Sequence, residues 1–177
     1  MKIKKYTQFL NESVKYKLGC VMMEVPISNW KEITSTIDQE DIYEVEGENY
    51  GIQSNPHVTI LYGLHNEVSL DQIKSVFEDI DGSVDIKIEG IGVFENESFD
   101  VVKFNVVPTE TLQSLHDKLS EFPNSNEYPE YEPHITIAYV KKGSGKKYED
   151  LEYRHSVENV DEVCYSVPGG SREYFKI

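Results

Sequence analysis

The chain has 177 residues, 17 of them Lys or Arg and 32 Asp or Glu, so its formal net charge is −15. This length fits one domain, and no apolar run reaches the ~18 to 20 residues of a membrane-spanning helix. The acidic balance disfavours long nucleic acids, which proteins bind largely through Lys and Arg. Cys20 and Cys164 are too few for a disulfide framework and are typical of a reducing cytoplasm. We therefore expect a cytoplasmic protein, without membrane attachment, that takes a small ligand.

Hydrophobic periodicity predicts a mixture of strands and helices along the chain. A buried strand at 18–25 is followed by a helix capped at Ser28 and by an acidic loop over 38–55, which we expect to be mobile. A second helix begins at a capping box of Ser69 and Gln72, and a third begins at Thr109. The other predicted strands are 57–62, 84–94, 99–107, 134–140, 161–167 and 173–177. Hairpins occur and helices do not alternate strictly with strands, which indicates the α+β class.

One seven-residue motif occurs twice. PHVTILY at 56–62 recurs as PHITIAY at 133–139, with five of the seven residues identical. The two histidines are 77 residues apart, and each motif follows a loop and falls in a predicted strand. Similarity at this spacing indicates two related lobes whose equivalent strands lie side by side.

Side chains along a strand point alternately to its two faces. Strict alternation places Tyr62 and Tyr139 on the face that packs into the core. The two histidines and two threonines of the motifs fall on the opposite face, where a pseudo-twofold would bring them into one cleft. These four residues are His57, Thr59, His134 and Thr136.

Two imidazoles and two hydroxyls fit the cleavage of a phosphodiester. One imidazole takes a proton from the attacking oxygen and the other gives a proton to the departing oxygen, because both titrate near neutrality. The hydroxyls donate hydrogen bonds to the non-bridging phosphate oxygens as charge develops there. The sequence does not decide which histidine is the base; we favour His134 as base and His57 as acid.

Two simpler interpretations compete with catalysis. A single histidine in a strand is usually structural, although a matched pair of His-x-Thr strands makes that interpretation weaker. A zinc site would need three ligands, commonly with a second histidine two or four residues on, and here the residue two positions on is Thr59 or Thr136. We therefore expect neither a metal nor another cofactor.

The paired motifs, His57-Val58-Thr59-Ile60 and His134-Ile135-Thr136-Ile137, resemble those of the 2H phosphoesterase superfamily. That superfamily includes RNA 2′-5′ ligase-like proteins, cyclic phosphodiesterases and phage enzymes that degrade cyclic oligonucleotide defence signals. The resemblance covers residues 17–177. It implies a two-lobed, pseudo-symmetric α+β fold, with antiparallel sheets flanked by helices around a central cleft. It also implies metal-independent phosphodiester cleavage by the two histidines and two threonines.

The resemblance leaves the substrate open. The acidity of the chain favours a compact nucleotide, and we expect a cyclic nucleotide or oligonucleotide signal. One alternative is a 2′,3′-cyclic phosphodiesterase that acts on RNA or tRNA ends. A second alternative, from a different functional class, is a non-catalytic sponge that binds cyclic nucleotides without cutting them.

Residues 1–13 resemble the amino-terminal leader of internal head proteins of large tailed phages. Leu10-Asn11-Glu12 fits the pattern after which their prohead proteases cut. A short amphipathic helix without a targeting role is the alternative. If the leader is real, the enzyme is packaged in a phage head, enters the host cytoplasm and acts against a defence signal. We expect residues 14–177 to form a single two-lobed phosphoesterase domain.

Four further residues are candidates for substrate binding. Lys141 and Lys142 belong to the basic turn just after the second motif, where a ligand phosphate would meet them. Arg172 follows two glycines and could contact a phosphate or a base. Tyr50, in the loop before the first motif, could stack on a base.

Overall fold

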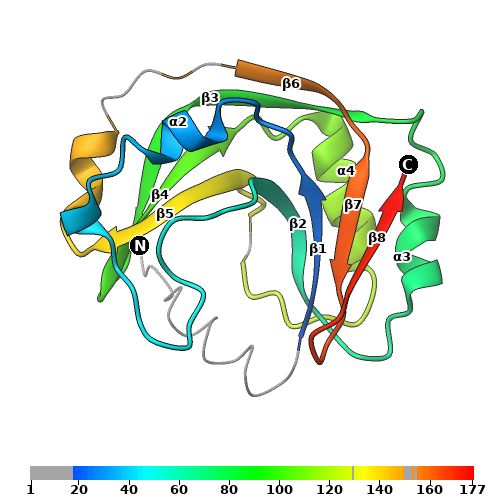
Figure 1. The fold of residues 1–177 in the computed structure, drawn as a ribbon. Helices are drawn as coiled ribbons and strands as arrows, with labels where there is room; N and C mark the ends of the chain where they lie inside the picture. The colour runs from blue at the N-terminus through cyan, green and yellow to red at the C-terminus, as the bar shows by residue number, and fades with distance from the viewer. Residues whose placement is uncertain (1–17, 129, 150–152, 154) are drawn as a thin grey trace.

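The computed structural model describes residues 18–128, 130–149, 153 and 155–177, and these form two antiparallel four-stranded sheets (Figure 1). The sheets have the strand orders β2-β1-β7-β8 and β5-β4-β3-β6. The strands are β1 (Gly19–Glu24), β2 (His57–Leu64), β3 (Val84–Glu95), β4 (Phe99–Val106), β5 (His134–Lys141), β6 (His155–Val160), β7 (Glu162–Ser166) and β8 (Arg172–Lys176). The helices are α2 (Trp30–Thr34), α3 (Leu70–Val76) and α4 (Glu110–Ser120), with 3-10 turns η1 (Gln39–Asp41) and η2 (Gly145–Tyr148). This arrangement confirms the α+β prediction.

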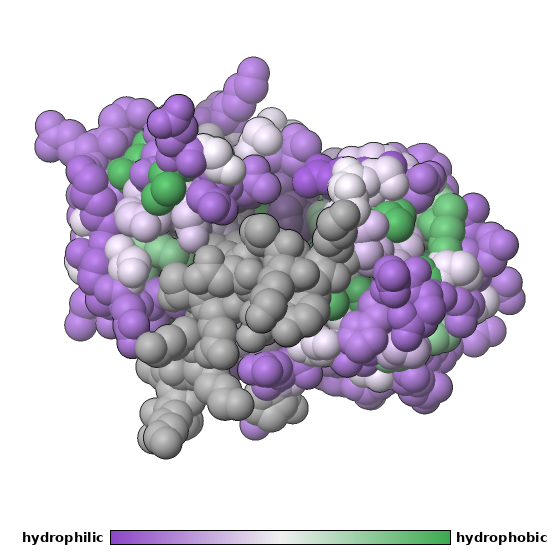
Figure 2. All heavy atoms as spheres, turned by 90° about the horizontal axis from the view of Figure 1, so that it is seen from below, coloured by the Kyte–Doolittle hydropathy of each residue, from purple (hydrophilic) through white to green (hydrophobic). Residues whose placement is uncertain are grey.

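The two sheets repeat one order of elements. A strand, a helix and a loop precede the motif strand in each half of the chain: β1 and α2 precede β2, and β4 and α4 precede β5. Each of these helices packs on the sheet of the other half, since α4 contacts β2 and α2 contacts β5. Both motif strands are at the edge of their sheets, and β2 contacts β5 where the lobes meet (Figure 1). Figure 2 shows the described surface hollowed between the two lobes. The internal repeat in the sequence therefore corresponds to a repeat in the fold.

Apolar stripes of the helices cover the outer faces of the sheets. In α4, Leu112, Leu115 and Leu119 are at most 1% exposed, because their spacing of three and four residues puts them on one face. Trp30 of α2 packs edge-on against Phe104 of β4, at a ring separation of 6.3 Å. Burial of these side chains fixes both sheets against a common core and leaves the opposite faces available.

The helix starts follow the predicted caps at two of three sites. The Ser69 side chain accepts from the Gln72 amide, which completes the capping box, and Thr109 caps α4. The first helix begins at Trp30 with Asn29 as N-cap, so the prediction of a cap at Ser28 was one residue early. Strand β6 was not predicted, because HSVENV is largely polar; it pairs with β3 at the edge of its sheet.

A β-bulge interrupts each motif strand at the same place. The pairing register skips Ile60 in β2 and Ile137 in β5, the residue directly after each motif threonine. One extra residue reverses the alternation of the side chains beyond it. Tyr62 and Tyr139 therefore lie on the same sheet face as the histidines. The expectation that both tyrosines lie on the face away from the histidines was wrong, because it assumed an unbroken strand. Tyr139 is nevertheless buried, in a small cluster with Phe99 and Val101.

Candidate active site

Equivalent backbone contacts hold the start of each motif strand. The Val25 amide donates to the carbonyl of Pro56 at 2.9 Å, and the Val106 amide donates to that of Pro133 at 3.1 Å. Each contact ties the residue before the histidine to the end of the neighbouring strand. The first residue of β2, His57, and the first residue of β5, His134, thus begin their strands in matching positions.

The two imidazoles also share one orientation. His57 Nδ1 lies 2.9 Å from the carbonyl of Asn55, and His134 Nδ1 lies 2.8 Å from the carbonyl of Glu132. A carbonyl oxygen only accepts, so Nδ1 must carry the proton in both rings. The Nε2 atom is then a base when the ring is neutral and an acid when the ring is charged. Each histidine can therefore serve proton transfer through Nε2.

Neighbouring contacts bring the motif strands together. The Tyr131 hydroxyl, from the loop before β5, donates to the Thr59 carbonyl of β2 at 3.1 Å. His116 of α4 stacks on Tyr131 at 4.3 Å, and its Nδ1 lies 2.7 Å from the Ile60 carbonyl. His57 is also near enough for its charge to lower the pKa of His134.

The sheet register defines the neighbours of the second motif. Directly opposed residues in antiparallel strands share a face, which puts Lys103 beside Thr136 and Asn105 beside His134. Phe94 of β3 meets His134 edge to face, at 4.9 Å and 88°. The Lys103 ammonium lies 4.2 Å from the centre of the Phe94 ring. The sequence did not predict Lys103 as a site residue, because only the pairing of β4 with β5 brings Lys103 next to the second motif.

His134 has a strongly shifted pKa. The pKa is lowered to about 4, mainly by burial and in smaller part by the charges of Lys103 and His57, while the hydrogen bond to the Glu132 carbonyl acts in the opposite direction. At neutral pH the ring is therefore uncharged. Its Nε2 lone pair is available to accept a proton.

The first motif has different neighbours. Met22 opposes Thr59 and Glu24 opposes His57 on β1. Cys20 is in hydrogen-bond contact with Thr59, although burial raises the pKa of this thiol to about 12, so it remains protonated. The two halves of the site thus match in histidine and threonine but differ in charge.

Three of the predicted binding residues are engaged by other groups of the protein or lie away from the motif strands. Lys141 donates to the carbonyl of Glu40. The Lys142 ammonium lies 3.1 Å from buried Asp100 and 3.3 Å from Glu95, so its charge is already balanced within the turn. Arg172 begins β8 at the edge of its sheet, on the face of His57 but separated from β2 by β7 and β1. Its hydrogen bond to Tyr174 raises the guanidinium pKa.

Tyr50 belongs to an aromatic cluster on the face of His134. Its ring lies 5.1 Å from Tyr43 and Phe99 and 5.2 Å from Tyr139. The segment that carries it is bound to the edge of β5, since the Tyr139 amide donates to the Gly51 carbonyl at 2.9 Å. The loop expected to be mobile is thus hydrogen-bonded to the motif strand, and Tyr50 is held beside the site.

A pocket of about 840 Å³ opens next to the first motif. Its lining includes Asn55 and Pro56, which lead into β2, and Glu24 of β1, but neither histidine. Among residues 18–128, 130–149, 153 and 155–177, no three His, Cys, Asp or Glu side chains are grouped so as to hold a metal ion.

The sequence itself identifies the family. Residues 26–154 match the family model of the 2′-5′ RNA ligase superfamily, so the chain belongs to that superfamily. The resemblance to 2H phosphoesterases is confirmed, and with it the enzyme class, a phosphodiesterase of the 2H type. In sequence, no curated protein matches the chain.

Solved structures share the fold at low sequence identity. Usb1 of Kluyveromyces marxianus has a TM-score of 0.62 at 11% identity, over 93% of this chain and 100% of that one. LigT of E. coli, complexed with 3′-AMP, has a TM-score of 0.55 at 14% identity, over 90% and 94%. The MHV ns2 PDE domain has a TM-score of 0.50 at 16% identity, over 90% and 98%. Each described helix of this chain is too short or too polar to span a bilayer.

Proposed function

We propose that this chain cleaves a phosphodiester of a small nucleotide by general acid–base catalysis between His57 and His134, without a metal. The observation that carries the proposal is the matched pair of imidazoles. Both begin a motif strand, and both have Nδ1 on a backbone carbonyl, which leaves Nε2 for proton transfer. Proton transfer by one positioned group contributes roughly 10²- to 10⁴-fold to the rate.

The difference between the two lobes supports distinct roles for the histidines. Because burial and the nearby ammonium hold the pKa of His134 near 4, this ring is the neutral base. His134 Nε2 takes a proton from water, or from a 2′-hydroxyl, as that oxygen forms its bond to phosphorus. His57 Nε2–H gives its proton to the departing oxygen as the second P–O bond breaks. Protons and charge balance in this step, and the turnover is complete when His134 releases its proton to solvent and His57 takes one up.

The threonines complete the proposed site. Thr59 and Thr136 lie two residues after the histidines on the same face, before the bulge alters the alternation. Their hydroxyls would donate to the non-bridging oxygens, where negative charge increases in the transition state. Binding alone would not require two proton carriers, so their pairing favours turnover over the cyclic-nucleotide sponge.

Two observations support a small nucleotide as substrate. The net charge of −15 opposes a long polyanion. Solved structures of similar fold hold mononucleotides: Usb1 with uridine monophosphate and LigT with 3′-AMP. We propose a cyclic nucleotide or oligonucleotide signal as the substrate. Action against a host defence signal, in the host cytoplasm after packaging in a phage head, depends on the leader at 1–13, which lies outside the described residues.

The test is a substrate panel in the presence of EDTA. The purified chain is incubated with cyclic mono-, di- and trinucleotides and with oligomers that end in a 2′,3′-cyclic phosphate, and products are identified by mass spectrometry. Cleavage of a cyclic oligonucleotide that His57→Ala and His134→Ala both abolish supports the proposal. Opening of terminal cyclic phosphates alone would establish the RNA-end alternative. Tight binding without product would establish the sponge, and loss of activity in EDTA would contradict metal independence.

A further inference from the structure

A buried lysine lies beside the second motif and takes no part in the mechanism above. Lys103 of β4 is 7% exposed and opposes Thr136 on the same sheet face. Its ammonium donates to the Asn105 side chain and lies over the Phe94 ring. The position of Asn105 depends in turn on Gly92, where a Cβ would come within 2.6 Å of the Asn105 oxygen. Asn105 of β4, together with Phe94 and Gly92 of β3, thus holds the ammonium in place.

The charge of this lysine is poorly balanced by its surroundings. Among the described residues, no carboxylate lies within 4.0 Å of its ammonium. Burial lowers the pKa of Lys103, and the more distant Glu132, before β5, and Glu149, after η2, act against that shift. A buried ammonium is costly unless an anion or several acceptors accompany it. One amide oxygen and one aromatic face leave its other donors available to a ligand.

The lysine also makes the two halves of the site unequal. The residue that opposes the first motif threonine, in the place equivalent to Lys103, is Met22. A methionine gives no charge, so only the threonine of the second motif is opposed by a cation. On the face of His57, the charge of Arg172 acts on Cys20, but β7 and β1 separate this arginine from β2.

We infer that Lys103 binds a non-bridging oxygen of the phosphodiester and orients it toward His134. The inference rests on the proposed function, because it concerns the phosphate held between the same two histidines. The ammonium would neutralise charge that develops on that oxygen while the attacking group approaches from the His134 side. The same charge keeps a proton off His134 before the substrate arrives. Asn105 and Phe94 act as positioning residues for the ammonium.

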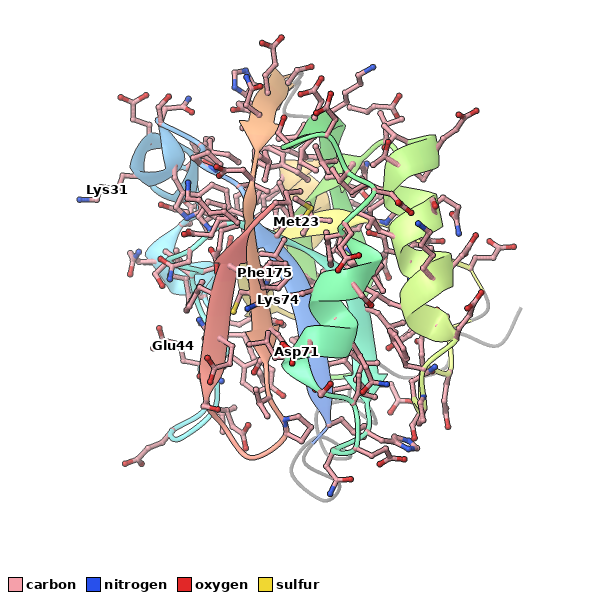
Figure 3. All side chains as sticks on the ribbon, turned by 90° about the vertical axis from the view of Figure 1, so that its right-hand side faces the viewer. Met23, Lys31, Glu44, Asp71, Lys74 and Phe175 are labelled. Carbon is pink, nitrogen blue, oxygen red and sulfur yellow. The ribbon has the colours of Figure 1, made fainter. Side chains whose placement is uncertain are left out.

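The experiment compares Lys103→Met, which keeps the length and removes the charge, with Lys103→Arg, which keeps the charge. Lys74→Met is the matched control, because Lys74 also lies over a phenylalanine, Phe175, at 5.8 Å (Figure 3). That pair is on α3 and β8, away from the motif strands. We measure kcat and KM on the substrate that the wild-type chain cleaves fastest, and inhibition by inorganic phosphate.

Removal of one charge-stabilising donor typically costs about 10²- to 10³-fold in rate. We therefore expect Lys103→Met to lose ~100-fold in kcat/KM and to bind inorganic phosphate ~10-fold more weakly. Lys103→Arg should recover at least part of both losses, and Lys74→Met should match the wild type. Lys103→Met with near wild-type kcat/KM and phosphate affinity would overturn the inference. So would a folded Lys103→Arg that is as poor as Lys103→Met.

A titration separates this inference from the proposed function. By NMR, the pKa of His134 should rise in Lys103→Met and stay unchanged in Lys74→Met, whether or not the chain turns over a substrate. If no panel member is cleaved, the proposed function fails, and the phosphate and titration data still decide the role of Lys103. Circular dichroism checks the fold, and Lys103→Gln serves as a second neutral variant if Lys103→Met does not fold. An unchanged His134 pKa in the folded neutral variant would contradict the electrostatic role.

Discussion

Lowering the pH from 7 to 5 tests directly whether His134 is the base of the reaction. With a pKa of about 4, roughly nine-tenths of His134 remains neutral at pH 5. An ordinary imidazole with a pKa near 6.5 would be only about 3% neutral at that pH. The two cases differ about 30-fold in the fraction of competent base. A general acid is not lost on acidification, so kcat/KM at pH 5 should not fall appreciably below its value at pH 7.

The assay is kcat/KM from pH 3.5 to pH 8, since this parameter reports the free enzyme. We expect the acidic limb near pH 4, with circular dichroism at each pH to show that the chain stays folded. An acidic limb near pH 6.5 would refute the reasoning, because it would mean that the base of the reaction is an unperturbed imidazole.

Further predictions test the other groups. His57→Ala and His134→Ala should each lower kcat by at least ~100-fold with an unchanged melting temperature; a variant with normal kcat would remove that histidine from the mechanism. Thr59→Val and Thr136→Val should each lower kcat by ~10- to 100-fold with little change in urea midpoint, and a larger effect on fold than on rate would contradict their role. Asp100→Ala removes an acceptor for the Gly143 and Gly145 amides at 2.8 and 3.1 Å, so urea unfolding should show a loss of about 3 kcal/mol.

The pKa of His134 also predicts how stability depends on pH. Between pH 6.5 and pH 4 the unfolded chain binds a proton at His134 that the folded chain does not bind. The contribution of this residue to the free energy of unfolding is therefore intact above about pH 6.5 and falls as the pH drops toward 4. His134→Asn should unfold with a shallower pH dependence over this window, and an unchanged slope would contradict the shift.

Local patterns in the sequence were sufficient for most of the elements, β6 excepted, and for the repeat. The capping box of Ser69 and the spacing of Leu112, Leu115 and Leu119 are local signals, and both act in the structure as expected. The motif pair predicted two equivalent strands because its identity extends over five of seven positions. These features depend on neighbours within a few residues, which a sequence displays directly.

Features that depend on strand pairing were not predictable. The bulge at Ile137 moves Tyr139 to the face of His134, and nothing in ITIAY indicates an extra residue. Lys103 is 31 residues before His134, and only the register of β4 against β5 makes it a neighbour of Thr136. Tyr50 was a candidate because it is an aromatic residue in the loop before the first motif, yet its place depends on hydrogen bonds between that loop and β5.

The most direct measurement is a crystal structure of the chain with orthovanadate, which mimics the five-coordinate phosphorus. We expect one vanadate between the lobes, with Nε2 of His57 and Nε2 of His134 within hydrogen-bond distance of oxygens on opposite sides of the metal. Vanadate bound at another surface, or in contact with only one of the two rings, would contradict the account.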